Sequence, residues 1–258
     1  MSRLAAAFAG KKPFIAFLTG GDPSLADTRR YVRALVDAGA GIVEIGVPFS
    51  DPIAEGPVIQ EASQRALAAG TTTDNLFELV AALRDADGIT VPLAFMTYLN
   101  PVYHYGYERF FAAAAAVGLD AIIIPDLPYE EQGEVKAVAA AHGVAVISLI
   151  APTSAARVRM IAAEAEGFIY LVSSLGVTGT RAEITTDIAA IVSEIRAVTD
   201  TPVAVGFGIN TPEQAADLAA TADGVIVGSA IVKLIAAHGA AADDAIAAYV
   251  TQMSSALS

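Results

Sequence analysis

Cysteine is absent from this chain of 258 residues, which excludes disulfide bonds, thiolate metal sites and cysteine nucleophiles together. The absence fits a reducing compartment, and we expect the protein in the cytoplasm. Histidine is also scarce: the sequence has only His104, His142 and His238, and none belongs to a cluster with metal-ligand spacing. Because His142 and His238 each precede a glycine at the expected end of a helix, we interpret both as helix-end residues and expect no bound metal.

Positive charge is scarce as well, with 15 Lys and Arg against 28 Asp and Glu and a net charge of −13. Nucleic acids and anionic membranes are held by clustered Lys and Arg, so this balance argues against both as partners. Hydrophobic residues make up 55% of the chain, yet every apolar run is interrupted before it reaches the length of a membrane span. An anionic ligand would therefore have to be held by backbone amides.

Short apolar runs alternate with amphipathic stretches along the chain. Eight such repeats are typical of a parallel barrel ringed by helices, in which active sites lie at the carboxyl ends of the strands. We therefore predict an α/β fold, a single (β/α)8 TIM-barrel domain over residues 1–258, with a short helix from Leu4 to Phe8 at one barrel end and extra helices in the loops. A doubly wound open sheet is the alternative. The expected strands are 14–18, 42–46, 93–97, 121–124, 145–150, 168–171, 203–206 and 224–227.

Glu44 is a single carboxylate inside an otherwise apolar strand. Alternation along the strand puts Val43 and Ile45 on the face that packs against the helices, so Glu44 faces the barrel interior. None of the expected strands carries a Lys or Arg to pair with it, which leaves two explanations: a site that uses the carboxyl group, or a neutral acid held by hydroxyls. Burial should raise its pKa toward neutrality, as suits a group that both takes and gives a proton. Glu44 is the leading catalytic candidate.

Two further acids, Asp51 and Glu55, lie on the loop that follows this strand. Asp51 precedes a proline, and we interpret it as a turn residue. For Glu55 two readings stay open. It complements the positive end of the helix that begins near Pro57, or the loop lowers it onto a substrate opposite Glu44.

Glycine-bearing segments late in the chain indicate phosphate handling. They are residues 176–179, 206–208 and 228–229. Gly228 and Ser229 end the last expected strand and open a helix, so free backbone amides and the helix dipole face the barrel top. The loops after strands seven and eight form the recurrent phosphate site of such barrels. Ordinary turn glycines are the alternative explanation.

Several motifs occur in order along the chain: TGGDP at 19–23, EIGVPFSDP at 44–52, PDLP at 125–128, Tyr170 followed by GVTG at 176–179, GFGI at 206–209 and GSAIV at 228–232. Through these motifs the chain resembles the alpha chains of tryptophan synthase over nearly its whole length. The resemblance implies retro-aldol cleavage of indole-3-glycerol phosphate to indole and glyceraldehyde 3-phosphate, with no cofactor in this chain. It gives Glu44 the role of acid and base at the breaking bond.

The resemblance also implies a second carboxylate that interacts with the indole N–H, and its position here is Glu55. The family usually has Asp there, so the acid in this sequence is one methylene longer, and positioning errors of about 1 Å cost roughly 100-fold in rate. A second departure is Ser174, where some relatives carry Arg. Tyr170 is expected to hydrogen-bond near Glu44, although core packing would also explain it.

Substrate contacts are carried over in the same way. Phe207, with Tyr98 and Leu99, is expected to form an apolar wall for the indole ring. Thr178 is expected in the loop that closes over the substrate. The residues expected to meet the phosphate are Gly179, Gly208, Gly228 and Ser229.

The segment from Tyr98 to Tyr105 is rich in tyrosine and apolar groups for a loop at the active face, as protein interfaces are. Folding of this loop onto its own barrel is equally compatible with the composition. The resemblance favours an interface through Asn100, Pro101 and Tyr103 with a beta chain that carries pyridoxal phosphate, in an assembly of two alpha and two beta chains. Two alternatives to a competent lyase stay open: a weakened subunit that mainly activates its beta chain, and another phosphate-binding barrel such as a sugar-phosphate isomerase.

Overall fold

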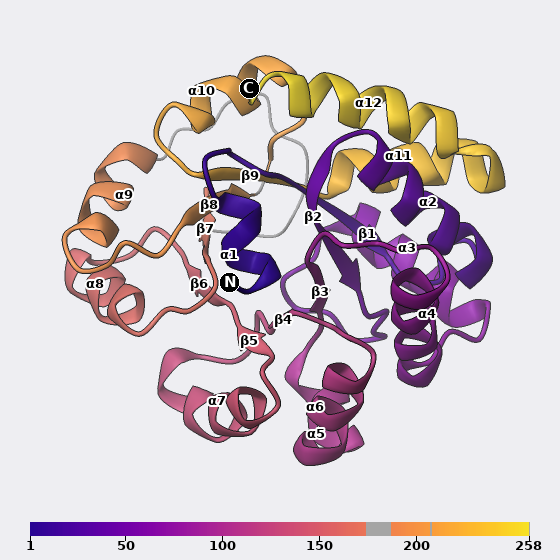
Figure 1. The fold of residues 1–258 in the computed structure, drawn as a ribbon, viewed down its shortest axis with the longest axis horizontal. Helices are drawn as coiled ribbons and strands as arrows, with labels where there is room; N and C mark the ends of the chain where they lie inside the picture. Colours follow the sequence, from indigo (N-terminus) through magenta and orange to yellow (C-terminus); the bar gives the residue numbers. More distant parts are fainter. Residues whose placement is uncertain (174–186, 207, 258) are drawn as a thin grey trace.

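The computed structural model describes residues 1–173, 187–206 and 208–257. Within them, one parallel sheet has the strand order β5-β4-β3-β2-β1-β9-β8-β7-β6. The two ends of this order, β5 and β6, are halves of one stretch interrupted at Ile147, so the sheet closes on itself as a barrel of eight strand positions (Figure 1). The strands are β1 Phe14–Thr19, β2 Ala40–Gly46, β3 Leu93–Met96, β4 Ala121–Ile123, β5 Ala145–Val146, β6 Ser148–Ile150, β7 Ile169–Val172, β8 Val203–Gly206 and β9 Gly224–Val227.

Helices surround this barrel (Figure 1). They are α1 Arg3–Phe8, α2 Leu25–Asp37, α3 Pro57–Ala68, α4 Thr73–Asp85, α5 Leu99–Tyr105, α6 Tyr107–Ala116, α7 Gln132–Ala141, α8 Ala155–Ala163, α9 Ile188–Arg196, α10 Pro212–Ala219, α11 Ser229–His238 and α12 Asp243–Ser255, with 3-10 turns η1 Tyr129–Glu131 and η2 Gly239–Ala241. The predicted (β/α)8 barrel is confirmed, and the open sheet is excluded by closure.

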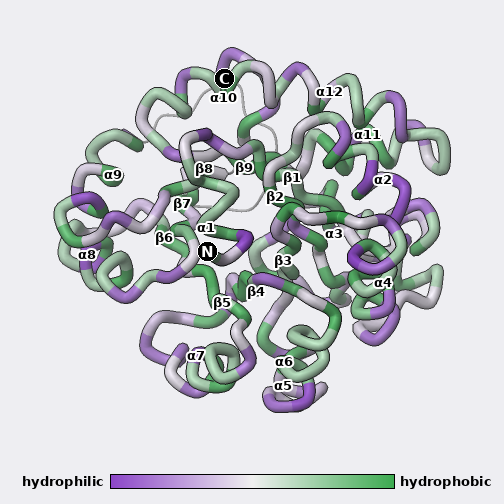
Figure 2. Tube along the Cα trace, in the orientation of Figure 1, coloured by the Kyte–Doolittle hydropathy of each residue, from purple (hydrophilic) through white to green (hydrophobic). Residues whose placement is uncertain are grey.

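Two apolar layers follow from the alternation of side chains along the strands. One face of each strand packs against the helices, and the other fills the barrel interior with small and branched residues such as Ala94, Ile42 and Ile226. Figure 2 shows hydrophobic residues along the strands and hydrophilic residues on the outer turns of the helices. No helix in the described ranges is long and apolar enough to cross a membrane.

The short helix α1 lies across the amino-terminal end of the barrel (Figure 1). Its Leu4 and Ala7 belong to the interior cluster, and the ring of Phe8 lies 5.8 Å from that of Phe168. Ser2 caps the helix by accepting a hydrogen bond from the backbone N–H of Ala5. The helix expected from Leu4 to Phe8 over one barrel end is therefore confirmed.

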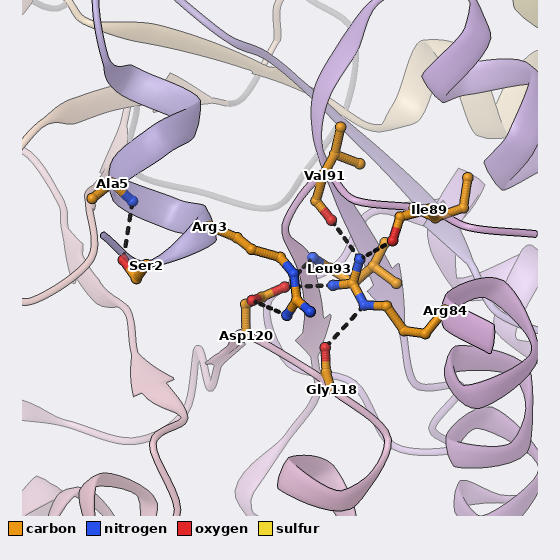
Figure 3. A network of polar contacts seen from close by, with 9 residues as sticks. All are labelled: Ser2, Arg3, Ala5, Arg84, Ile89, Val91, Leu93, Gly118 and Asp120. Carbon is orange, nitrogen blue, oxygen red and sulfur yellow. Dashed lines mark hydrogen bonds and ion pairs between the residues drawn. The ribbon is translucent and has the colours of Figure 1, made fainter.

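A polar network ties the same end together around Arg84 (Figure 3). The guanidinium of this α4 residue donates to the carbonyl oxygens of Ile89, Val91 and Gly118. It also pairs with Asp120 at 2.6 Å, and Arg3 of α1 reaches the other oxygen of Asp120 at 3.0 Å. Both side chains of the Arg84 pair are largely buried, and every polar atom named here has a partner, as an ion pair away from water requires.

One expected loop is a helix. Residues 98–105 were expected to be irregular, but Leu99–Tyr105 form α5. Pro101 lies in its first turn, where its missing N–H removes no helical hydrogen bond, so the proline does not prevent the helix. Both helix-end histidines lie where the sequence predicts, because His142 is the C-cap of α7 and His238 the last residue of α11.

Candidate active site

A cavity of about 360 Å³ opens at the carboxyl ends of the strands. Its floor is made by inward-facing residues of the barrel, and its rim by the segments that follow β2, β4, β6, β8 and β9. This is the end of a barrel at which active sites lie. Glu44, Glu55 and Tyr170 all line it.

Glu44 on β2 is fully buried, with Phe17 of β1 and Ala94 of β3 as its neighbours in register. Neither of its carboxyl oxygens has a hydrogen-bond partner among the described residues. Burial raises the pKa of Glu44 from 4.5 to about 8. The expected rise toward neutrality is confirmed, and within the described part of the chain no hydroxyl holds the carboxyl group. The carboxyl group therefore has hydrogen-bonding capacity that no described residue uses.

Tyr170 on β7 lies close enough to sense the charge of Glu44. Burial raises the pKa of Tyr170 well above 10, and the neighbouring Glu44 carboxylate raises it further. Room for the phenol ring comes from Gly206 on the adjacent strand β8, where an added Cβ would lie 2.6 Å from the Tyr170 hydroxyl. The glycine at the end of β8 thus lets a tyrosine stand beside the buried acid.

Glu55 comes from the loop between β2 and α3. It lines the cavity, its Oε2 is buried without a partner among the described residues, and burial raises its pKa from 4.5 to about 7. Tyr98 holds the loop in place, because its hydroxyl oxygen accepts hydrogen bonds from the backbone N–H groups of Ile53 at 3.1 Å and Ala54 at 2.9 Å. Of the two readings of Glu55, its place in the cavity favours a role toward the substrate.

Asp51 differs from Glu55 although both lie on this loop. It is exposed and accepts a hydrogen bond from the hydroxyl of its neighbour Ser50. It does not line the cavity. Its interpretation as a turn residue agrees with this place.

Another side of the cavity is formed by residues after β8 and β9. Gly208, Gly228 and Ser229 all line it, and Gly228 is the N-cap of α11. The amides at the start of that helix have no partner within the helix and carry its positive dipole end, so they suit an anion. The three other expected contacts, Phe207, Thr178 and Gly179, lie outside the described residues.

Apolar side chains cover much of the remaining wall, but they differ from those expected. Tyr98 and Leu99 are not among the lining residues, because the Tyr98 ring packs 5.2 Å from Phe49 and Leu99 packs into the outer core. Phe17 of β1 and Met96 of β3 take their place. Strict alternation along β1 and β3 would have identified both as inward-facing residues.

Asn100, Pro101 and Tyr103 lie on α5, outside the cavity. The Tyr103 side chain is 69% exposed and meets the ring of Tyr107 edge-on at 6.0 Å. No group of three potential ligands suited to a metal ion occurs in the part of the chain that the structure describes.

Comparison with known proteins agrees with this geometry. The family model described as tryptophan synthase alpha chain matches residues 4–257. The tryptophan synthase alpha chain of Lactiplantibacillus plantarum is 52% identical over 92% of this chain and 90% of its own. The crystal structure of the alpha subunit from Legionella pneumophila superposes with a TM-score of 0.90 at 38% identity, covering 100% of this chain and 98% of that one.

A third comparison concerns an assembly. A structure of the α2β2 tryptophan synthase complex from Pyrococcus furiosus contains a chain that superposes with a TM-score of 0.86 at 36% identity, covering 94% of this chain and 98% of that chain. Matches of this extent and sequence identity show more than a shared barrel fold. The chain belongs to the tryptophan synthase alpha chain family.

Proposed function

We propose that Glu44 carries both proton transfers in the cleavage of indole-3-glycerol phosphate, the reaction of this lyase family. The observation that carries the proposal is a pair of carboxyl groups, Glu44 and Glu55, with unpartnered buried oxygens and raised pKa values in one cavity. Family membership sets aside the sugar-phosphate isomerase that the sequence had left open.

Protonated Glu44 gives its proton to C3 of the indole, which turns the ring into an indolenine with a positive charge at nitrogen. The carboxylate then takes the proton of the hydroxyl group next to C3. The bond between C3 and the glycerol carbon breaks, its electron pair returns to the ring, and the hydroxyl oxygen becomes the aldehyde of glyceraldehyde 3-phosphate. Glu44 ends protonated again, as a group with a pKa of about 8 allows near neutral pH.

Ionised Glu55 faces the indole N–H and stabilises the positive charge that develops there. With a pKa of about 7, a large share of Glu55 is ionised at neutral pH. Tyr170 of β7 lies beside the Glu44 carboxyl group and acts with it in the catalytic site. Gly208, Gly228 and Ser229 bind the phosphate through backbone amides, together with Gly179. Phe207 packs on the substrate, and Thr178 belongs to the segment that closes over it.

The second part of the proposal is a docking face for a tryptophan synthase beta chain, formed by Asn100, Pro101 and Tyr103. Two exposed apolar side chains support it at this end of the barrel: Tyr103 on α5 and Ile53, 72% exposed, on the loop that carries Glu55. Tyr98 joins the loop to the start of α5, so a shift of either segment on binding a partner would change the position of Glu55. We propose an assembly of two alpha and two beta chains in the cytoplasm, with indole passed to the beta chain.

One assay tests both parts. Indole release from indole-3-glycerol phosphate is measured with and without beta chain for the wild type, Glu44→Gln and Tyr103→Ala. Release is expected from the wild type, loss of it from Glu44→Gln, and from Tyr103→Ala normal basal release with weaker stimulation by beta chain. Unaltered turnover in Glu44→Gln would refute the assignment of Glu44. A wild type that releases no indole alone but stimulates the beta chain would instead identify the weakened subunit.

A further inference from the structure

Part of the cavity wall is formed by the segment after β4, the first residue of α7, and the residues leading into and along α8. We call this part the Gln132 recess and define it by Leu127, Gln132, Thr153, Arg157 and Ile161, all of which line the cavity. None of these five residues has a part in the chemistry proposed above. All of them lie within the described ranges.

The barrel order places this recess across from the phosphate side. Around the closed barrel, β4 lies four strand positions from β9 in either direction, when β5 and β6 count as one position. Gly228 and Ser229 follow β9, whereas Leu127 and Gln132 follow β4. A substrate whose phosphate lies at Gly228 and whose five-membered ring lies at the carboxyl groups of β2 therefore directs its six-membered ring toward the Gln132 recess.

Gln132 has an unpaired buried oxygen in this recess. It is the first residue of α7 and only 8% exposed, yet its Oε1 is buried without a hydrogen-bond partner among the described residues. Buried amide oxygens are nearly always paired, so an orphaned one beside a cavity indicates a missing donor. Leu127 and Ile161 make the neighbouring surface apolar, as the edge of an aromatic ring requires.

Charge in the recess favours a neutral donor. Its cation, Arg157, is already engaged by both carboxylate oxygens of Glu130, at 2.6 and 3.1 Å. A bidentate pair of this kind leaves little attraction for an additional anion. A hydroxyl group matches Gln132 because it donates to an amide oxygen and carries no charge.

We propose that the Gln132 recess binds a hydroxyl substituent on the six-membered ring of the substrate, so that the enzyme also cleaves ring-hydroxylated indole-3-glycerol phosphates. The reaction is the one described above, and it yields a hydroxyindole and glyceraldehyde 3-phosphate. Gln132 acts as a specificity residue that accepts a hydrogen bond from the substituent. The inference rests on the proposed placement of the substrate at Glu44 and Gly228.

Binding of product-like probes tests the recess without catalysis. Dissociation constants are measured by calorimetry for indole and for its 4-, 5-, 6- and 7-hydroxy derivatives, with the methyl and fluoro derivatives as controls of size and polarity. At least one hydroxyindole is expected to bind about tenfold more tightly than indole and than its methyl and fluoro counterparts, the gain from one buried hydrogen bond. Equal binding of all hydroxy derivatives and their methyl counterparts would overturn the proposal.

Gln132→Leu separates recognition from folding. It should abolish the preference for the hydroxyl group while changing the affinity for indole by less than about twofold, because only the hydrogen bond is removed. Its melting temperature should not fall, since the substitution also removes an unpaired buried oxygen. A lower melting temperature, or an equal loss of affinity for every probe, would assign Gln132 a structural role instead. Gln252→Leu, an exposed position on α12, is the matched control.

Turnover of hydroxylated and unsubstituted substrates tests the recess separately from the lyase activity. The kcat/KM of the matching hydroxylated substrate is expected to fall about tenfold in Gln132→Leu, and that of the unsubstituted substrate to stay within about twofold. If wild-type enzyme cleaves only the unsubstituted substrate, the recess proposal is wrong while the function stands. If it cleaves neither, the proposed function is wrong.

Discussion

The hydroxyl oxygen of Tyr98 accepts a hydrogen bond from the backbone N–H of Ala54 at 2.9 Å, one residue before Glu55. A second hydrogen bond, from Ile53, makes this phenol the anchor of a loop whose tip is exposed. Glu55 is therefore positioned from the start of α5, after the neighbouring strand β3, rather than by its own loop alone. Glu55 also depends on Gln60 of α3, whose side-chain amide donates to the Glu55 backbone carbonyl at 2.7 Å.

Removal of the anchor tests this dependence. Tyr98→Phe keeps the packing against Phe49 but leaves two backbone donors without their acceptor, so kcat is expected to fall about tenfold through misplacement of Glu55. Steady-state indole release measures it. Tyr105→Phe, which removes a hydroxyl bonded to Asp74 outside the cavity, is the control. Equal effects in the two variants would show that Tyr98 does not position the acid.

The length of the acid can be tested directly. Because Tyr98 holds the loop, Glu55→Asp should draw the carboxylate back by about one bond length instead of letting the loop advance, and should lower kcat/KM by tenfold to about 100-fold. Full activity in Glu55→Asp would mean that the loop follows the acid. The double variant with Tyr98→Phe then decides whether the anchor sets this limit, since a freed loop should restore part of the activity.

The pH dependence of kcat/KM should be bell-shaped. Glu55 works ionised, and its pKa of about 7 gives the acid limb; Glu44 starts protonated, and its pKa of about 8 gives the alkaline limb. Indole release at substrate concentrations well below KM should therefore be fastest between these two values. Glu55→Gln should lose the acid limb along with much of the rate. A flat profile across this interval would contradict both assignments.

Stability should also depend on the protonation of Glu44. Its pKa rises from 4.5 to about 8 on folding, so between these values the folded state binds more protons than the unfolded state. The free energy of unfolding therefore falls as pH rises through this window and stays reduced above it. Urea unfolding should show Glu44→Gln more stable than the wild type by a few kcal/mol at alkaline pH, with little difference at acid pH.

The Arg84 network at the amino-terminal end of the barrel should contribute to stability without affecting kcat. Arg84→Met removes one of the two arginines paired with Asp120 and the donor to three backbone carbonyls, and should cost about 3–5 kcal/mol of unfolding free energy. Urea denaturation measures this loss, and kcat per folded molecule should not change. Arg33→Met removes an exposed arginine that lies 3.9 Å from Asp87, and should cost less than about 1 kcal/mol. Similar losses in both variants would contradict the role of the Arg84 network.

Much of the fold could be predicted because strand burial leaves a periodic trace in the sequence. The eight expected strands occur within two residues of their predicted ends, apart from the interruption at Ile147, and Glu44 faces the interior as alternation requires. The helix α5 was missed because its proline and aromatic residues resemble a loop when local preferences alone are read.

Relations between distant residues were beyond prediction. Tyr98 lies 44 residues from Ala54, and nothing in either segment marks the contact. The unpartnered oxygen of Gln132 likewise becomes visible only when every neighbour has been placed. The family resemblance placed Tyr98 in the substrate wall, but a motif does not show which surface the ring of one of its residues faces in this chain.

The helix α1 closes the barrel at the end away from the cavity, with Leu4, Ala7 and Phe8 over the interior in which Glu44 is buried. Water kept out at that end is water that cannot solvate the carboxylate from behind. The raised pKa of Glu44, which faces the cavity at one end of the barrel, thus depends partly on α1 at the other end. An extension fused to the amino terminus, far from any substrate, would act on the chemistry through that seal.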